Sequence, residues 1–150
     1  MTAMPYPSDS TIRSVSAALA TVEAFFEGLQ NGEFASCAAL FTEDAVVWNN
    51  FDQRAESSAE AMAALAALTP VRLRFTIASR DVIDEVCVQR HAVSLLAPDG
   101  RTASFPAIQR IVLQGHKIAR IDEYLDRTTM QDAARAVQPG AGRLDDTLKR

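Results

Sequence analysis

The sequence predicts an α+β domain in which helices come first and a mostly antiparallel sheet follows. Over residues 12–41 the apolar residues recur every three or four positions, which is the period of amphipathic helices. From residue 71 onward they alternate with polar residues, which is the period of strands with one buried face. Turn-forming residues separate the later strands, so neighbours in the chain should pair antiparallel.

The length and composition suit one compact domain. The chain has 150 residues, of which 48% are apolar and 23% are charged. Residues 1–9 carry two prolines and polar turn formers, and residues 138–150 carry a proline, two glycines and a run of charged residues. We therefore expect a flexible arm over 1–9, a single domain over 10–137 and a flexible tail over 138–150.

The first helix is predicted from about Ser10 to Asn31. Its apolar stripe consists of Ile12, Val15, Leu19, Val22, Phe26 and Leu29. Gly32 ends it, because glycine readily adopts the left-handed conformation that follows many helices. A short second helix is predicted from residues that continue the helical period, namely Phe34, Cys37, Leu40 and Phe41.

A short strand over 45–49 and a third helix come next. Ser57 and Glu60 have the spacing of a capping box, which predicts that the third helix begins there. It should end before Pro70, because proline disfavours a helical conformation in the residue that precedes it.

Four strand-like runs and a terminal helix complete the domain. The runs occupy residues 71–77, 86–96, 102–113 and 118–126. Short turns around Asp99 and His116 join the last three as hairpins. A helix is predicted over 128–137, and we expect the sheet to bend strongly around the helices.

Charge and cysteine content argue against several classes of protein. The net charge is −4, and Lys and Arg are scattered singly, so no basic stripe for nucleic acid is formed. No apolar run approaches the roughly 20 residues of a membrane span, and the N-terminus has no signal sequence, so a cytoplasmic location without membrane contact is expected. Cys37 and Cys87 are expected to be buried free thiols. The sequence has no metal-ligand spacing and no phosphate loop, so no metal or cofactor is predicted.

Polar residues on otherwise apolar strand faces are the candidate catalytic residues. Glu123 shares a face with Ile121 and Leu125, and a buried carboxylate needs a cation, hydrogen-bond donors or a proton. Arg90 shares a face with Val86, Val88 and Ala92, which makes it the natural partner of Glu123. Asn49 adds an amide at the end of the first strand.

Some of these assignments have alternatives. Arg90 and Glu123 form either a site or a structural ion pair. His91 has the opposite parity from Arg90, so alternation places it on the outer surface or against a dimer partner, unless a bulge turns it inward. Trp48 either lines the pocket or covers the outer face.

The order of elements resembles that of the NTF2-like superfamily, and in particular its SnoaL-like and limonene-1,2-epoxide hydrolase-like cone proteins. The hydrolase pattern covers about residues 20–130, and its matching segments are 43–49, 89–92 and 116–126. Segments 44–52 and 121–126 also resemble those of SnoaL-like proteins. The resemblance implies three N-terminal helices packed on a strongly curved, mostly antiparallel mixed sheet that encloses a pocket.

The resemblance also implies roles for individual residues. By position, Arg90 matches the Arg of the hydrolase site, Asn49 its Asn and Glu123 its second acid. Ala92 and Val47 stand where that enzyme has its first Asp and its Tyr, so its pair of acid and base is incomplete. Ketosteroid isomerases of the same superfamily have a general-base Asp where this chain has Asn49, whose amide cannot take up a proton.

We therefore expect a pocket for a mostly apolar, oxygenated small molecule such as a terpenoid, steroid or polyketide fragment. An isomerase, cyclase or hydrolase would use acid/base chemistry by Glu123, Arg90 and Asn49. A noncatalytic binding or dimerisation module of the same fold is the alternative. The residues expected to contact the substrate are Val47, Trp48, Ala92, Phe105, Ala107, Ile121 and Leu125.

A homodimer is also predicted. The outer parity of the last strands carries four apolar residues, Val93, Leu95, Ile108 and Val112. Such a face is more apolar than a solvated sheet face should be, so pairing of two sheets would bury it.

Overall fold

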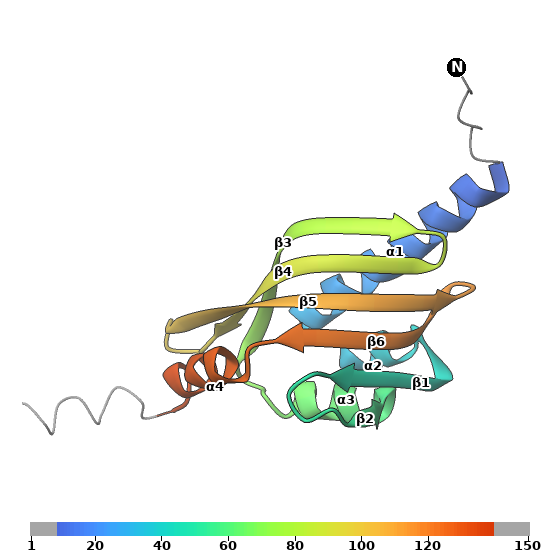
Figure 1. Ribbon diagram of the computed structural model, residues 1–150. Helices are drawn as coiled ribbons and strands as arrows, with labels where there is room; N and C mark the ends of the chain where they lie inside the picture. Colours follow the sequence, from blue (N-terminus) through green and yellow to red (C-terminus); the bar gives the residue numbers. More distant parts are fainter. Residues whose placement is uncertain (1–8, 140–150) are drawn as a thin grey trace, which may run out of the picture.

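The computed structural model describes residues 9–139, and the side chains of residues 15–139. Figure 1 shows the elements, which are α1 (Asp9–Asn31), α2 (Phe34–Ala38), β1 (Phe41–Asn49), β2 (Ala55–Ser57), α3 (Ser58–Ala66), β3 (Arg72–Ile83), β4 (Val86–Leu96), β5 (Thr102–Gln114), β6 (Lys117–Leu125) and α4 (Arg127–Ala136). The predicted arm and tail lie outside the described residues, except for the positions next to the domain, and so does the side chain of Ile12.

The six strands form one mixed sheet in the order β2-β1-β6-β5-β4-β3. Strands β3 to β6 pair antiparallel with their sequence neighbours, which confirms the predicted hairpins. β1 returns to lie parallel to β6. The short strand β2 was not predicted, because three residues are too few for an alternating pattern to be recognised.

The sheet is not strongly curled, which differs from the prediction (Figure 1). Sharp bends in a sheet come mainly from bulges and glycines. β4 and β5 contain no glycine. They pair without a register shift from Val86 opposite Val112 to Leu96 opposite Thr102. Bulges occur elsewhere, as between Ile77 and Ser79 in β3, but the centre of the sheet is regular.

Helices α1, α2 and α3 cover one face of the sheet, which we call the inner face, and α4 lies at one end of the sheet (Figure 1). The predicted stripe of α1 is confirmed at Val22, Phe26 and Leu29, which are buried. Within the described residues, no helix is both long and apolar enough to cross a membrane.

The start of α3 follows the predicted capping box. Ser57 Oγ accepts a hydrogen bond from the Glu60 amide over 3.1 Å, and Glu60 Oε2 accepts one from the Ser57 amide over 3.0 Å. These two bonds satisfy donors that a helix start leaves free. The helix ends at Ala66, four residues before Pro70, as proline requires.

The short helix α2 is held close to α1. The Cys37 side chain contacts α1 and donates a hydrogen bond from Sγ to the Phe25 carbonyl oxygen over 3.5 Å. A Cβ atom added at Gly28 would lie 2.6 Å from that sulfur, so the absence of a side chain at Gly28 permits the approach. Cys37 and Cys87 are both buried and free, as predicted.

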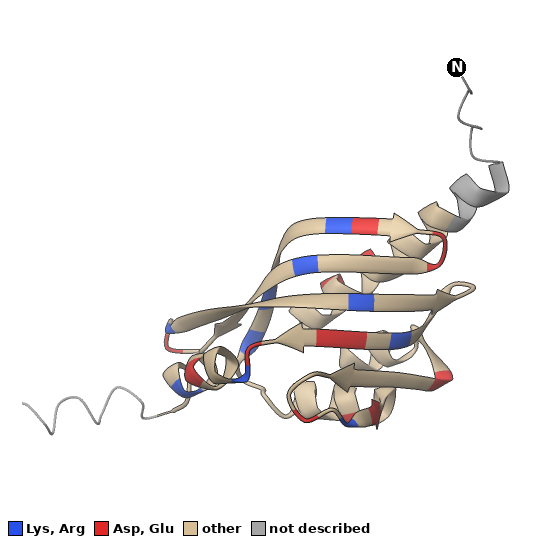
Figure 2. Cartoon of the chain, in the orientation of Figure 1, with Lys and Arg blue, Asp and Glu red and all other residues tan. Residues whose placement is uncertain are grey.

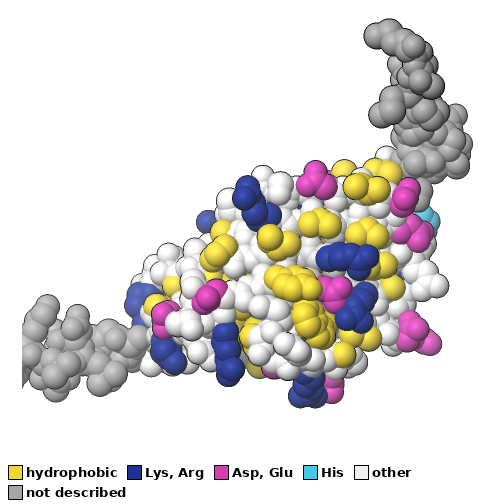
Figure 3. Space-filling view, in the orientation of Figure 1, with side chains coloured by type: hydrophobic (Ala, Val, Ile, Leu, Met, Phe, Trp, Pro, Cys, Tyr) yellow, Lys and Arg dark blue, Asp and Glu magenta, His cyan; other side chains and the backbone are white. Residues whose placement is uncertain are grey.

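The opposite face of the sheet, which we call the outer face, is not covered by helices. Figure 3 looks onto it, and hydrophobic side chains gather across its middle among charged ones. Ile108 and Tyr124 are prominent members, with 43% and 52% of their surface exposed. The prediction for Val93 and Leu95 is wrong, because both are buried on the inner face.

Charged residues on the strands are spread over the sheet. Figure 2 shows Lys and Arg distributed along β3, β4, β5 and β6, with acidic residues between them. On the outer face, Asp122 lies 2.7 Å from Arg120 and 3.8 Å from Arg110 at the nearest nitrogen–oxygen distances. The two arginine side chains are about half exposed, and ion pairs with solvent-exposed partners typically contribute below about 1 kcal/mol each.

Candidate functional site

A row of polar side chains crosses the inner face of the sheet. Arg80 on β3 lies opposite Gln89 on β4, and Gln89 lies opposite Gln109 on β5. Gln109 lies opposite Glu123 on β6, and Glu123 is paired with Asn49 on β1. Cross-strand partners share a face of the sheet, so these residues form one row. His91, which lies two residues from Gln89 on the same face of β4 and is hydrogen-bonded to it, belongs with them, and we call the whole set the polar row.

The polar row separates two apolar clusters. The α1 cluster lies on one side and includes Val22, Phe25, Phe26, Phe41, Cys87, Ile111, Ile118 and Ile121. The α4 cluster lies on the other side and includes Leu73, Val93, Leu95, Phe105, Ala107, Leu125, Ala133 and Val137. On β6, for example, Glu123 stands between Ile121 of the first cluster and Leu125 of the second. A molecule bound at the row would therefore meet apolar walls on both sides.

Arg80, Gln89 and His91 form a buried hydrogen-bonded group at the β3 end of the row. Arg80 Nε donates to Gln89 Oε1, and Gln89 Nε2 lies 2.9 Å from His91 Nδ1. Gln89 and His91 are 0% and 1% exposed. The rings of Phe26 and Phe75 pack edge-on against the imidazole, with centroids 5.5 and 5.4 Å away. Packing and hydrogen bonding together fix the position of His91.

His91 is neutral at physiological pH. Burial, helped by the positive charge of Arg80, lowers the pKa of His91 to about 4. Arg80 has only donors, so it orients the Gln89 oxygen toward itself and the Gln89 amide group toward His91. Nδ1 of His91 then accepts, and the ring proton lies on Nε2. That nitrogen is buried and has no hydrogen-bond partner within residues 9–139.

Glu123 carries the only carboxylate of the row. Its Oε2 accepts a hydrogen bond from Gln109 Nε2 over 2.6 Å. Burial raises the pKa of Glu123, and the Gln109 hydrogen bond only partly opposes that shift. No salt bridge in the described part of the chain involves Glu123. The residue is only partly buried overall, so a small molecule can reach it more easily than it can reach His91.

Gln109 connects Glu123 to the rest of the row. The carboxylate binds the amide nitrogen of Gln109, so the amide oxygen faces away from it. This Oε1 atom is buried and lacks a hydrogen-bond partner in the part of the chain that the structure describes. The row thus holds two unpartnered buried polar atoms, which is uncommon in folded proteins.

Asn49 lies at the open end of the row beside Glu123. Its Oδ1 accepts a hydrogen bond from the Asp52 amide over 3.2 Å, which stabilises the turn after β1. The next residue, Asn50, accepts a hydrogen bond from the Leu125 amide over 3.0 Å. Asn50 therefore attaches the β1–β2 turn to β6, whereas Asn49 bonds within the turn, and its Nδ2 donates no hydrogen bond to another residue in the described part of the chain.

Three predicted site residues lie on the outer face instead. Arg90 is exposed there, so the predicted pair of Arg90 with Glu123 is wrong. Ala92 lies on the same outer face of β4. Trp48 packs edge-on against Tyr124 with ring centroids 5.4 Å apart, which answers the open question of its orientation.

The other predicted contact residues lie on the inner face. Phe105, Ala107, Ile121 and Leu125 are buried there, and Val47 packs against the α1 cluster. They flank the polar row on both sides. Their contact with a substrate stays a prediction.

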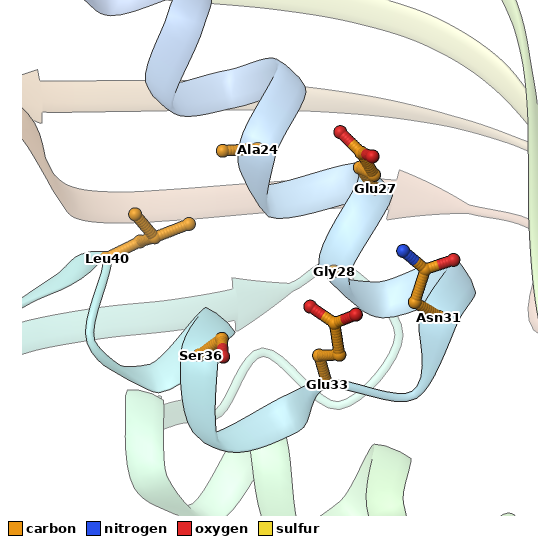
Figure 4. A pocket seen from close by; sticks show the side chains of 7 residues that line it. All are labelled: Ala24, Glu27, Gly28, Asn31, Glu33, Ser36 and Leu40. Carbon is orange, nitrogen blue, oxygen red and sulfur yellow. The ribbon is translucent and has the colours of Figure 1, made fainter.

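Two hollows are found near α1, and neither is lined by a residue of the polar row. The first, of about 350 Å³, is shown in Figure 4 and is lined by Ala24, Glu27, Gly28, Asn31, Glu33, Ser36 and Leu40. The second, of about 480 Å³, is lined by Gln30, Asn31, Arg72, Leu73, Arg74, Phe75 and Leu96. Over the described residues, no group of three or more His, Cys, Asp or Glu side chains is placed to hold a metal ion.

Sequence reasoning missed Arg80, Gln89 and Gln109, and it placed His91 on the wrong face. The sequence did contain one signal for the inward orientation of Gln89, Gln109 and His91. The turn at Pro98–Gly100 sets Leu96 opposite Thr102, so odd-numbered residues of β4 face odd-numbered residues of β5. Since Phe105 and Ala107 were predicted to face inward, the odd positions of β4 had to face inward as well.

The sequence itself matches a known family. The model of the SnoaL-like domain matches residues 22–121. The chain belongs to the SnoaL-like domain family. No curated protein matches it significantly. The fold is NTF2-like, as comparison with solved structures shows.

Several solved structures are similar to this SnoaL-like protein. An LEH-like epoxide hydrolase of M. tuberculosis has a TM-score of 0.70 at 17% identity, and the match covers 87% of this chain and 94% of that one. An NTF2-like protein of unknown function from Burkholderia pseudomallei has a TM-score of 0.68 at 12% identity, covering 79% and 97%. A putative SnoaL-like polyketide cyclase from Shewanella putrefaciens has a TM-score of 0.66 at 13% identity, covering 77% and 94%. At these identities the likeness concerns the fold alone.

Proposed function

We propose that the polar row binds a mostly apolar small molecule that carries oxygen atoms, and that Glu123 exchanges a proton with it. The position of Glu123 is the observation that carries this proposal. The residue lies between Ile121 and Leu125 and is only partly buried as a whole, and its carboxylate has one neutral donor, Gln109. Structural pairing would have supplied a cation here, whereas a site for acid/base chemistry needs a carboxylate that is not neutralised.

The raised pKa of Glu123 suits proton exchange. A carboxyl group whose pKa is moved toward neutrality holds its proton closer to physiological pH and can give it up or take it back. The apolar clusters on both sides would contact the hydrocarbon part of the substrate. Asn49, beside Glu123, would donate a hydrogen bond from Nδ2 to a substrate oxygen.

The relatives support the same class of ligand. One similar structure is described as an epoxide hydrolase and another as a putative polyketide cyclase. Both descriptions name chemistry on oxygenated carbon skeletons. For this chain we propose terpenoid, steroid or polyketide-like molecules, with an isomerase, cyclase or hydrolase reaction.

A noncatalytic binding protein is the second candidate. The pKa of His91 is lowered to about 4 and the amide of Asn49 carries no exchangeable acid, so among the described residues of this site Glu123, whose pKa is raised, is the group best suited to exchange a proton. This favours binding, or an isomerisation in which one carboxyl group removes and returns the same proton, over a reaction that needs a separate acid and base.

The experiment has two stages. Melting temperatures are first measured with a panel of terpenoids, steroids and aromatic polyketides, because a ligand at a hundredfold excess over its Kd stabilises the fold by about 2.7 kcal/mol. Compounds that stabilise the protein are then assayed for conversion by the wild type, Glu123→Gln and Asp122→Asn. Asp122 is the matched control, since it is the neighbouring carboxylate on the outer face of the same strand.

Loss of conversion in Glu123→Gln, with conversion retained in Asp122→Asn, is the result expected for an enzyme. Full conversion by Glu123→Gln would refute the role of Glu123. If substitutions in the polar row weaken ligand binding and neither the wild type nor any variant converts the ligand, the protein is a noncatalytic binding protein.

A further inference from the structure

The two unpartnered atoms of the polar row are of opposite kind. His91 Nε2 carries a proton and is a donor, and Gln109 Oε1 is an acceptor. Both are buried on the inner face, on the neighbouring strands β4 and β5. His91 lies opposite Ala107, so Gln109 is its diagonal neighbour in the sheet. Aromatic and long side chains of diagonal neighbours are within reach of one another.

The charged ends of the row fix these two roles. At one end, Arg80 can only donate, which orients Gln89 and leaves the proton of His91 on Nε2. At the other end, the Glu123 carboxylate can only accept when it is ionised, which orients Gln109 and leaves Oε1 free. Each hydrogen bond in the series thus runs in the same direction, from the cation toward the anion.

One link of that series is missing, between His91 and Gln109. The group that completes it must accept a hydrogen bond from His91 Nε2 and donate one to Gln109 Oε1. A hydroxyl group does both with a single oxygen atom. A carbonyl or ether oxygen accepts but cannot donate, so it leaves Gln109 Oε1 unpartnered. An ammonium group donates but cannot accept, so it leaves the His91 proton unpartnered.

We infer that the gap between His91 and Gln109 is a site for a hydroxyl oxygen, occupied by water in the free protein and by an alcohol or phenol group of the bound ligand. The ligand part of this inference rests on the proposed function, while the water part does not. A site that hydrogen-bonds both ways to a hydroxyl discriminates strongly against analogues that lack it, because a buried polar atom of the protein is then left unpaired.

The test compares three matched probes on the full-length chain by calorimetry: 1-tetralol, 1-tetralone and 1-methoxytetralin. They share one hydrocarbon frame and differ in the oxygen group. We expect the alcohol to bind about tenfold more tightly than the ketone and the ether. In Gln109→Met, the alcohol should lose this advantage while the ketone keeps its affinity. In His91→Phe, all three should bind equally weakly.

The control variant is Ser104→Ala, on the outer face of β5, which should leave the ranking of the probes unchanged. A crystal structure of the free protein supplies the second arm. If the three probes bind alike, or none binds, and an ordered water bridges His91 Nε2 and Gln109 Oε1, then water is the occupant. The absence of both alcohol preference and bridging water overturns the inference. Equal binding of the three probes would still leave the proposed small-molecule function standing.

The direction of the hydrogen bonds between Arg80 and Glu123 can be tested on the wild-type protein by nuclear magnetic resonance. The nitrogen chemical shifts of the His91 ring distinguish the tautomer protonated on Nε2 from the one protonated on Nδ1. We expect the Nε2 tautomer throughout the neutral range. The Nδ1 tautomer would overturn the inference, because His91 would then present an acceptor to the gap instead of a donor.

Discussion

Gln109 lies directly opposite Glu123 in the antiparallel pairing of β5 and β6, and its side-chain amide donates to the carboxylate over 2.6 Å. The donor is neutral, so it offsets only part of the free energy that burial of a charge costs. The carboxylate therefore has its hydrogen bond but not a counter-charge.

Glu123→Gln should raise the stability of the folded protein at high pH. The pKa of Glu123 is raised in the folded state, so its contribution to stability is present below the unfolded pKa and is lost as the pH rises through the folded pKa. The glutamine variant has no such loss. Thermal unfolding between pH 4 and 9 should show a melting temperature above that of the wild type at pH 8, with the difference shrinking toward pH 4.

Glu43→Gln serves as the control for this series, because Glu43 is exposed near the start of β1. Its difference from the wild type should not change with pH. A Glu123→Gln variant that is uniformly less stable across the whole range would contradict the burial of an uncompensated charge.

His91 should make the protein sensitive to mild acid. Its folded-state pKa of about 4 lies below the unfolded value of 6.5, so the neutral ring contributes stability that is present above pH 6.5 and lost as the pH falls toward 4. The full difference corresponds to about 3 kcal/mol. Urea unfolding of the wild type and His91→Phe at pH 4.5 and 7 should show a smaller acid-induced loss in the variant.

His116→Gln is the matched control, since His116 is exposed in the turn between β5 and β6. It should follow the wild type at both values of pH. If His91→Phe did so too, the imidazole would not be buried and neutral as described.

Gly28 and Cys37 should show strong energetic coupling. Alanine normally stabilises a helix interior by about 1 kcal/mol relative to glycine. At Gly28, the added Cβ would lie 2.6 Å from the Cys37 sulfur, so Gly28→Ala should instead destabilise the protein. In a Cys37→Ala background the obstacle is gone, and Gly28→Ala should become neutral or stabilising. A double-mutant cycle with urea unfolding measures the coupling, and additive effects would contradict the close approach of α1 and α2.

The outer face should form a homodimer, as the sequence already suggested. Ile108 and Val88 each expose 43% of their surface there, next to Tyr124 and Val112. In a two-fold symmetric interface both chains would carry the introduced charge, so Ile108→Asp should dissociate the dimer. Light scattering at micromolar concentration should give twice the 16.3 kDa of one chain for the wild type and for Ala63→Asp on exposed α3, but a single chain for Ile108→Asp. A monomeric wild type would refute the dimer.

The order of helices and strands could be predicted from the sequence because it depends on local periodicity and on a few end signals. The stripe on α1, the capping box at Ser57 and the hairpin turns are all features of short segments. The strong curvature was inferred from the resemblance to cone proteins rather than from the residues. The regular pairing of β4 with β5, which contain no glycine to bend them, is the physical reason why that expectation failed.

The candidate site was harder to predict because both faces of β4 are similarly apolar. Val86 and Val88 alternate with Cys87, and Ala92 alternates with Val93, so periodicity alone could not say which set is buried. Choosing the wrong set brought Arg90 into the site and excluded His91. Glu123 was found because its two neighbours on the same face are plainly apolar, whereas Gln89 and Gln109 became visible only when the register between strands was known.

The division of the interior by the polar row also has a consequence for motion. Apolar contacts make a protein open as one cooperative unit, and a band of amide and charged groups interrupts them. We therefore expect the end of the domain formed by α4 and the adjoining strand ends to separate transiently while α1 remains docked on its half of the sheet. Backbone amides of α4 should exchange with deuterated solvent well before those of Val22 and Phe25, which lie within the larger cluster. Such an opening would expose the buried row from the α4 side, and it gives a route by which a molecule could enter.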